Sequence, residues 1–456
     1  MTARTARNTL IGVAALVVVA GLGVAAWVGL QPGPMEFTNG KPVSLASYPG
    51  HTPTGVPAEL ANADLVTRGR YLTRTADCEA CHTAQGGRPF AGGRAFSLPF
   101  GTLYAPNITP DKETGIGEWT DADFLRAVHR GIARDGTRLY PAFPYASYTM
   151  LSDSDVLAIK AYLFSLPPVH QDTLPNTFEF PYNQRWLMLF WAMLFNSNDR
   201  FRPVDSESPE WNRGAYLVEA LAHCGECHTP RNMFQSLDNR LKFSGGVVQG
   251  WNAYNITSDK GTGVGNWTPA ELASYLSSGH ATGRGTAGGP MAEAVELSFR
   301  YMVPSDIAAM VVYLKSIPAV KSENIPDRLA DAASPLHSNG APGNPLGKRI
   351  FEGTCASCHA WTGKGAIRAE AQLTGSRAVN DPSAMNVAQM VLTGSGRRPD
   401  DKASMPAFGA IFTDAEVAAV SNYVTARFGS EPSHIDAADV AQLRQQSGAM
   451  LAARDH

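Results

Sequence analysis

Three five-residue stretches of this chain share one pattern: Cys78-Glu-Ala-Cys-His82, Cys224-Gly-Glu-Cys-His228 and Cys355-Ala-Ser-Cys-His359. They contain all six cysteines of the 456 residues, and a histidine follows each pair at once. The chain therefore repeats one chemical unit three times and keeps no cysteine for another purpose.

This spacing is the pattern of covalent haem c attachment. Each thiol can form a thioether with a haem vinyl group, and the histidine that follows can then bind the iron. We predict three covalently bound haem c groups, each with its iron. The attachment residues are Cys78 with Cys81, Cys224 with Cys227, and Cys355 with Cys358, and the iron ligands are His82, His228 and His359.

Two other interpretations of a Cys-x-x-Cys pair explain less. A structural zinc site takes four ligands, usually from two neighbouring pairs, whereas these pairs lie more than a hundred residues apart. A thioredoxin-like redox pair explains neither the histidine nor the threefold repetition. Exported proteins commonly use cysteines for disulfides, and here we expect the haems to stabilise the fold in that role.

The first two segments are copies of one another. The sequence NITPDKETGIGEWT at 107–120 returns as NITSDKGTGVGNWT at 255–268, an offset of 148 residues. Each copy leads into a predicted helix, capped by Thr120 or Thr268. The repeated Asn107 and Asn255 either bind haem propionates or support a turn, and we favour the turn.

Methionine is a usual second axial ligand of haem c. For the second haem we predict Met291, with Met302 as the less favoured choice. For the third haem we predict Met405, which lies fifty residues after Cys355 and ahead of a helix capped by Thr413.

The first copy differs at the ligand position. The 148-residue offset places Phe143 opposite Met291, and phenylalanine cannot bind iron. Met150 is the methionine nearest to this position, and we predict it as the ligand, against a simple role in the core. The alternatives are His129, His170, or an open iron with Phe143 as a shielding wall. The other histidines, His223 among them, are expected on the surface or in loops.

The N-terminus predicts the compartment. Arg4 and Arg7 precede an uncharged apolar run from Leu10 to Leu30, which as a helix would cross the roughly 30 Å hydrocarbon layer. Its length favours a retained anchor over a cleaved signal peptide, although Val24-Ala25-Ala26 would suit cleavage. The arginines place the N-terminus inside and the haem domains in the periplasm, on the inner membrane.

We expect a mainly α fold with three cytochrome c-type domains in tandem behind one N-terminal transmembrane helix. The predicted divisions are an anchor at 1–32, a linker at 33–60, domain 1 at 61–175, a connector with an apolar helix at 176–206, domain 2 at 207–330, a linker at 331–345, domain 3 at 346–430 and a C-terminal tail at 431–456, which we expect to form a docking helix. The apolar run at 186–195 is too short to span a bilayer, so we expect it to pack between domains or to contact the membrane or a quinone. A net charge of −3, with 17% charged residues, argues against a nucleic-acid partner.

Together these features resemble a known family. The anchor, the three Cys-x-x-Cys-His motifs, the NITxDxxTGxGxW elements and the LYPAFPY stretch at 139–145 are similar to triheme cytochrome c subunits of membrane-bound bacterial dehydrogenases. The resemblance covers nearly the whole chain. It implies an electron-transfer subunit that has no catalytic residue and is no enzyme on its own. Such a subunit passes electrons from a catalytic dehydrogenase subunit to ubiquinone.

The resemblance also bears on the partner. Alcohol dehydrogenase cytochromes of this family typically have PAMPY where this chain has PAFPY at 141–145, and AIKAYLFSLPPV at 158–169 and NQRW at 183–186 look more like the aldehyde dehydrogenase branch. The favoured partner is a molybdopterin subunit with an iron–sulfur subunit. The alternatives are a quinoprotein alcohol dehydrogenase or a flavin-dependent sugar or gluconate dehydrogenase. Two further hypotheses are peroxidase-like chemistry at the first haem and a stand-alone carrier that feeds a terminal oxidase.

Overall fold

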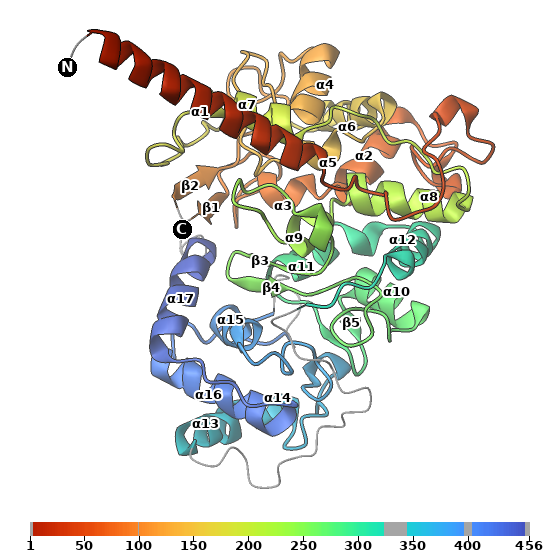
Figure 1. The fold of residues 1–456 in the computed structure, drawn as a ribbon. Helices are drawn as coiled ribbons and strands as arrows, with labels where there is room; N and C mark the ends of the chain where they lie inside the picture. The colour runs from red at the N-terminus through yellow and green to blue at the C-terminus, as the bar shows by residue number, and fades with distance from the viewer. Residues whose placement is uncertain (1–2, 99, 323–343, 396–403, 452–456) are drawn as a thin grey trace.

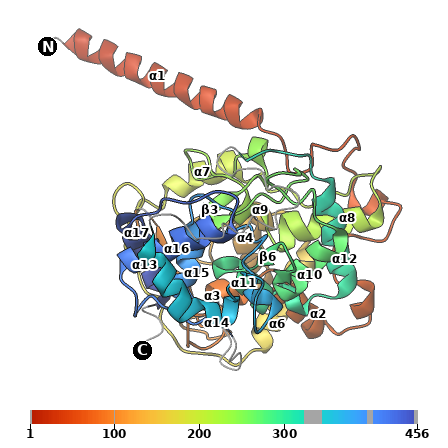
Figure 2. The same cartoon turned by 90° about the horizontal axis from the view of Figure 1, so that it is seen from below.

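Helices and loops make up nearly all of the described structure. The computed structural model describes residues 3–98, 100–322, 344–395 and 404–451. Helix α1 (Ala3–Gly29) projects from the body of the molecule, as Figures 1 and 2 show. The remaining elements form three groups that follow one another from top to bottom in Figure 1. The expected mainly α fold is confirmed.

The three groups have similar contents. The first contains α2 (Leu65–Thr75), α3 (Cys78–His82), β1 (Ala95–Leu98), β2 (Gly101–Tyr104), α4 (Asp121–Arg130), α5 (Tyr145–Tyr148) and α6 (Asp153–Ser165), and α7 (Leu187–Phe195) follows it. The second contains α8 (Pro209–Ala215), α9 (Gly225–His228), β3 (Gly246–Val248), β4 (Trp251–Ala253), α10 (Pro269–Ser278), β5 (His280–Ala281), β6 (Gly285–Thr286), α11 (Gly289–Leu297) and α12 (Pro304–Ser316). The third contains α13 (Pro345–Ile350), α14 (Ala356–His359), α15 (Met385–Thr393), α16 (Asp414–Phe428) and α17 (Ala437–Leu451). The strands pair as three antiparallel hairpins, β1 with β2, β3 with β4 and β5 with β6.

The same helix crossing occurs in all three groups. A helix ahead of the haem motif crosses a later helix through a glycine, in the pairs α2–α6, α8–α12 and α13–α16. A Cβ atom would lie 1.9 Å from the Ala158 carbonyl oxygen at Gly69, 2.0 Å from that of Ala309 at Gly214, and 2.2 Å from that of Ala419 at Gly347. Only glycine permits backbones to approach so closely. The sequence repeat therefore preserves a contact between two helices.

The first two groups share one hydrophobic core, whereas the third has its own. A reciprocal pair of buried hydrogen bonds joins the first two. Tyr71 donates from the first group to Asp306 of the second, at 2.6 Å, and Tyr216 donates back to Asp155, at 2.5 Å. The tyrosines occupy equivalent positions of the repeat, so the two groups face each other with approximate twofold symmetry. Because a buried carboxylate is costly without donors, these bonds specify the pairing of the groups.

The segment predicted as a free linker, 33–60, is packed along the first two groups. The Val43 amide donates to the Pro203 carbonyl at 2.8 Å, and the Gly55 amide donates to the Asp155 carboxylate, also at 2.8 Å. Proline and glycine made this stretch look extended in the sequence. An extended backbone can still satisfy its polar groups against a folded neighbour.

The C-terminal tail contains α17, which packs against α15 and α16 and also contacts β1 of the first group. Figure 1 shows this helix running along one side of the molecule. Arg444 of α17 pairs with Asp414 at 2.7 Å. The tail thus links the third group to the first. The linker predicted at 331–345 lies outside the described residues except for its last two.

Candidate functional site

Each motif histidine is held by a carbonyl oxygen of a following loop. The Nδ1–oxygen distances are 2.8 Å for His82 with Pro106, 2.6 Å for His228 with Tyr254 and 2.7 Å for His359 with Ala371. Since a carbonyl only accepts, Nδ1 carries the proton in all three rings, and the Nε2 lone pair is left for a metal. Metal-binding histidines regularly donate the N–H of their other ring nitrogen in this way.

The six cysteines and three histidines of the motifs all line one continuous cavity of about 2240 Å³. A typical pocket for a single ligand or cofactor measures only ~300–1,000 Å³. The three motifs therefore open into a shared space large enough for several large groups. Nothing in the sequence indicated that the three sites would be continuous with one another, because this depends on how the groups pack.

The protonation of the motif cysteines argues against a thioredoxin-like redox pair. Burial raises the pKa of the Cys81 and Cys224 thiols to about 12 and that of the Cys227 and Cys355 thiols to about 11. The reactive cysteines of redox pairs instead have a lowered pKa. Burial also lowers the pKa of the three motif imidazoles, which keeps them in the neutral, metal-binding form. Among the described residues, no three His, Cys, Asp or Glu side chains converge as a metal-ion site.

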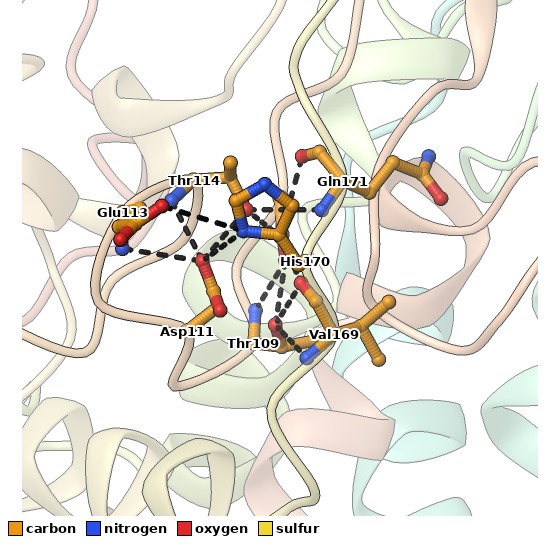
Figure 3. Close-up of polar contacts among 8 residues, drawn as sticks. Thr109, Asp111, Glu113, Thr114, Val169, His170 and Gln171 are labelled. Atoms are coloured by element: carbon orange, nitrogen blue, oxygen red, sulfur yellow. Dashed lines mark hydrogen bonds and ion pairs between the residues drawn. The ribbon is translucent and has the colours of Figure 1, made fainter.

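These observations fit haem c. Two thiols stand next to an imidazole with a free Nε2, at the wall of a cavity that can enclose a porphyrin. The wall itself is fixed by the repeated NIT segment. Asn107 accepts from the Thr109 amide at 2.9 Å and donates to the Val169 carbonyl at 2.7 Å, and Thr114 accepts from the Gln171 amide at 3.0 Å (Figure 3).

Asn255 repeats these contacts in the second group. It accepts from the Thr257 amide at 2.8 Å and donates to the Val320 carbonyl at 2.6 Å. Both asparagines are buried. The structure thus supports the turn-forming role for this pair.

Two of the predicted methionines line the cavity. Met291 stands in the first turn of α11, beside Gly289, whose φ of +52° lets the helix begin against the ring of Trp251. Both backbone polar groups of Met405 bond to Ser395: the Met405 amide donates to the serine hydroxyl at 2.9 Å, and the Ser395 amide donates to the Met405 carbonyl at 3.0 Å. Each methionine is therefore held by its backbone at the cavity wall.

The first group lacks a methionine at this place. Phe143 lines the cavity, and Met150 does not. Of the other ligands considered for this haem, His129 is buried beside Asp153, with Nδ1 3.7 Å from the carboxylate. His170 is exposed and turns toward the carboxylates of Asp111 and Glu113 (Figure 3). Neither histidine lines the cavity.

His223 lies in a loop, as expected of the remaining histidines, but it is half-buried at the cavity wall. Its ring centroid lies 5.3 Å from that of Tyr148, and burial lowers the pKa of its imidazole while the nearby Ala76 backbone opposes that shift. Its position directly before Cys224 was the only signal in the sequence. The partners come from the first group, so its place at the wall depends on the packing of the first two groups.

A largely buried ion pair connects the first two motifs. Arg94 donates to Glu293 at 2.6 and 2.8 Å and also to the carbonyl of Ala80, inside the first motif. Glu293 lies two residues after Met291, so the pair ties the first motif to α11 of the second group. Glu293 and the hydrogen bonds between them raise the pKa of Arg94 against the opposing effect of burial.

Tyr254 makes the corresponding link between the second and third motifs. Its carbonyl is the acceptor of His228, and its hydroxyl donates to Asp381 at 2.9 Å. Asn252 donates to the same carboxylate at 2.7 Å. The loop that orients the second histidine is therefore also an interface with the third group.

Comparison with known proteins agrees with this site. A cytochrome c family model matches residues 66–167 and 345–427. The fructose dehydrogenase cytochrome subunit of Gluconobacter japonicus is 36% identical over 86% of this chain and 85% of its own length. The gluconate 2-dehydrogenase cytochrome c subunit of Pantoea cypripedii is 36% identical over 85% of this chain and 91% of its own length.

A nicotinate dehydrogenase subunit of Pseudomonas putida is 38% identical over 87% of this chain, which spans only 33% of that longer protein. The fructose and gluconate dehydrogenase subunits are matched over most of their length, and their 36% identity with this chain shows that they are homologous to it. Their shared description agrees with the haem-attachment chemistry of the cavity. The chain belongs to the family of cytochrome c subunits of bacterial dehydrogenases, and is an electron carrier of such a complex with no catalytic activity on its own.

Proposed function

We propose that the chain is the triheme electron-transfer subunit of a membrane-bound periplasmic dehydrogenase. In this proposal it carries haem c in cytochrome c domains at 61–175, 207–330 and 346–430, and passes electrons from the catalytic subunit to ubiquinone. The observation that carries the proposal is the single cavity that all nine motif residues line.

Haem c supplies a one-electron redox couple when bound, and the protein supplies placement. The six cysteines would fix the three groups covalently, and the neutral imidazoles of His82, His228 and His359 would bind iron through Nε2. Met291 and Met405 would provide the second ligands of the second and third haems, which raises their potentials. Met150, the residue predicted for the first haem, packs against the core instead of lining the cavity.

The anchor supports the membrane location. Helix α1 includes 19 residues, Ile11–Gly29, with a mean hydropathy of 2.5, and is the one helix among the described residues long and apolar enough to cross a bilayer. Its last turns contact the region of α7, where the rings of Trp27 and Phe234 lie 6.3 Å apart. We propose that the body lies against the periplasmic face of the inner membrane on this side.

We further propose a molybdopterin aldehyde dehydrogenase with an iron–sulfur subunit as the partner, on the basis of the PAFPY stretch at 141–145. Purification of the tagged full-length chain from native membranes tests this assignment. Recovery of molybdopterin and iron–sulfur subunits would support it, and recovery of a quinoprotein or flavoprotein would replace it with the alternatives. Recovery of the chain alone would favour a stand-alone carrier.

Haem counting tests the triheme proposal itself. The full chain should contain three haems per polypeptide by haemochrome absorbance and intact mass. Replacing both cysteines of one motif with alanine should remove one haem, and each of the three double variants should do so equally. A wild-type count of two would overturn the proposal and would point to the motif whose variant leaves the count unchanged.

A further inference from the structure

The first haem motif has an unusual environment among the three. The offset of the repeat equates Phe143 with Met291, and both residues line the cavity. The Phe143 ring packs edge-on against Tyr148, with centroids 5.6 Å apart. Tyr148 in turn donates to the Ala76 carbonyl at 2.6 Å, directly ahead of the first motif. The rings of Phe143 and Tyr148 thus stand where the second group has the thioether of Met291.

Met150 is held away from this wall. Its carbonyl accepts from the Phe201 amide at 2.9 Å, and its side chain packs against the core shared by the first two groups. The residues on either side of it, Thr149 and Leu151, are both buried.

No other described methionine takes its place. The methionines that line the cavity are Met291, Met390 and Met405. The first and last belong to the second and third sites. Met390 is on α15, with its methyl group close to Gly288 at the start of α11. His223 is the one described non-motif histidine at the wall, where its ring packs against that of Tyr148 with centroids 5.3 Å apart.

The surface around Phe143 is apolar. Val128, Leu139 and Leu151 line the cavity with it. Two polar side chains of this part of the wall are engaged elsewhere: Tyr140 donates to the Tyr182 carbonyl at 2.9 Å, and Arg185 donates to the Arg138 carbonyl at 3.1 Å. A small uncharged iron ligand needs no hydrogen bond from such a wall.

We propose that the haem at Cys78, Cys81 and His82 keeps an iron position open on its Phe143 side, and that this position takes small uncharged iron ligands such as carbon monoxide. The inference rests on the proposed function only in requiring a covalent haem at this motif. It assigns an open ligand position to the first haem and no open position to the second and third haems.

Carbon monoxide titration of the dithionite-reduced full-length protein tests this site. One of the three haems should bind, seen as a Soret change of one third of the amplitude expected for all three. Phe143→Met should abolish the binding and add the red absorption band of methionine-ligated ferric haem. Phe143→Leu, the matched apolar control, should keep the binding.

Two results would overturn the inference. One is a three-haem protein that binds no carbon monoxide but gains binding in Met150→Leu or His223→Gln, because that residue would then be the ligand. The other is undiminished binding in Phe143→Met, which would place the site at another haem. A wild-type protein with no haem at the first motif would instead count against the triheme proposal, which the haem count detects separately.

Discussion

At the scale of single residues, His129 lies outside the cavity, and its burial has a measurable consequence. Burial, together with the charge of Arg200 and against that of Asp153, lowers its pKa to about 4. A histidine side chain in an unfolded chain has a pKa of about 6.5. Because the folded pKa is depressed, the unfolded chain binds more protons between these values, and stability falls as the pH drops through this window.

The wild-type melting temperature should therefore decrease between pH 6.5 and 4, with a loss of at most about 3 kcal/mol from this group. His129→Gln should flatten that part of the profile. Thermal melts followed at the Soret band across the pH range measure both curves. Parallel curves for the two proteins would show that another group causes the acid sensitivity.

The motif residues differ from His129 in how far the sequence could predict them. The cysteine and histidine positions could be predicted because haem attachment requires a contiguous pattern. The carbonyl partners of the histidines could not, although two of them, Pro106 and Tyr254, occupy the same position of the 148-residue repeat. The repeat therefore encodes the orientation of the imidazole through the backbone, which any residue type can supply.

At the scale of elements, the three helix crossings make a sharper test of packing. Gly69→Ala, Gly214→Ala and Gly347→Ala should each destabilise their group, because the new methyl group would overlap a carbonyl oxygen of the crossing helix. Overpacking of this kind costs about 1–3 kcal/mol or more. Gly353→Ala is the matched control, since a Cβ there meets nothing within 4 Å. Melting temperature and haem yield measure the effect, and equal losses at all four sites would contradict it.

Helix α7 exposes an apolar face beside the anchor. Trp186 is 60% exposed, Phe190 53% and Met193 72%. Trp191 is different, because its indole donates to the Phe234 carbonyl at 2.9 Å. The exposed residues lie on the side of the molecule where α1 leaves it, as the contact between α1 and α7 shows, so we expect them to enter the membrane interface.

Replacing Trp186, Phe190 and Met193 with serine should weaken the binding of a chain without residues 1–32 to anionic lipid vesicles. Removing the anchor is necessary because α1 would hold any variant on the bilayer. Ile367→Ser, which changes an exposed apolar residue of the third group, should leave binding unchanged. Flotation assays compare the variants, and equal binding by the triple variant would assign this face to a protein partner.

At the scale of the whole molecule, the repeat pattern identifies the units but not their contacts. Arg94 and Glu293 are 199 residues apart, and their pairing depends on the reciprocal docking of two repeats. The place of His223 at the cavity wall also depends on the packing of distant parts of the chain. So does the packing of segment 33–60, which its composition predicted to be a linker. Local patterns determine attachment chemistry, whereas long-range packing determines which charges and rings face each motif.

The Arg94–Glu293 pair leads to a prediction about redox potential. Both side chains are largely buried, so Glu293→Gln would remove the carboxylate that pairs directly with the guanidinium next to the first motif. A positive charge favours the reduced haem, and the midpoint potential of the lowest component of a spectroelectrochemical titration should rise. We assign that component to the first haem, because Phe143 stands where the second group has Met291 and a methionine ligand raises the potential of haem c. The protein should also lose about 3–5 kcal/mol of stability, as when one partner of a buried pair is removed.

Glu296→Gln is the matched control for this potential. Glu296 lies on the same helix and pairs with Arg300 nearer the surface, where both side chains are about one third exposed. Solvent screens such a pair, so its loss should move no potential. An equal shift in both variants would mean that the helix, and not the charge, controls the haem. A shift confined to Glu293→Gln would show that the second group tunes the cofactor of the first.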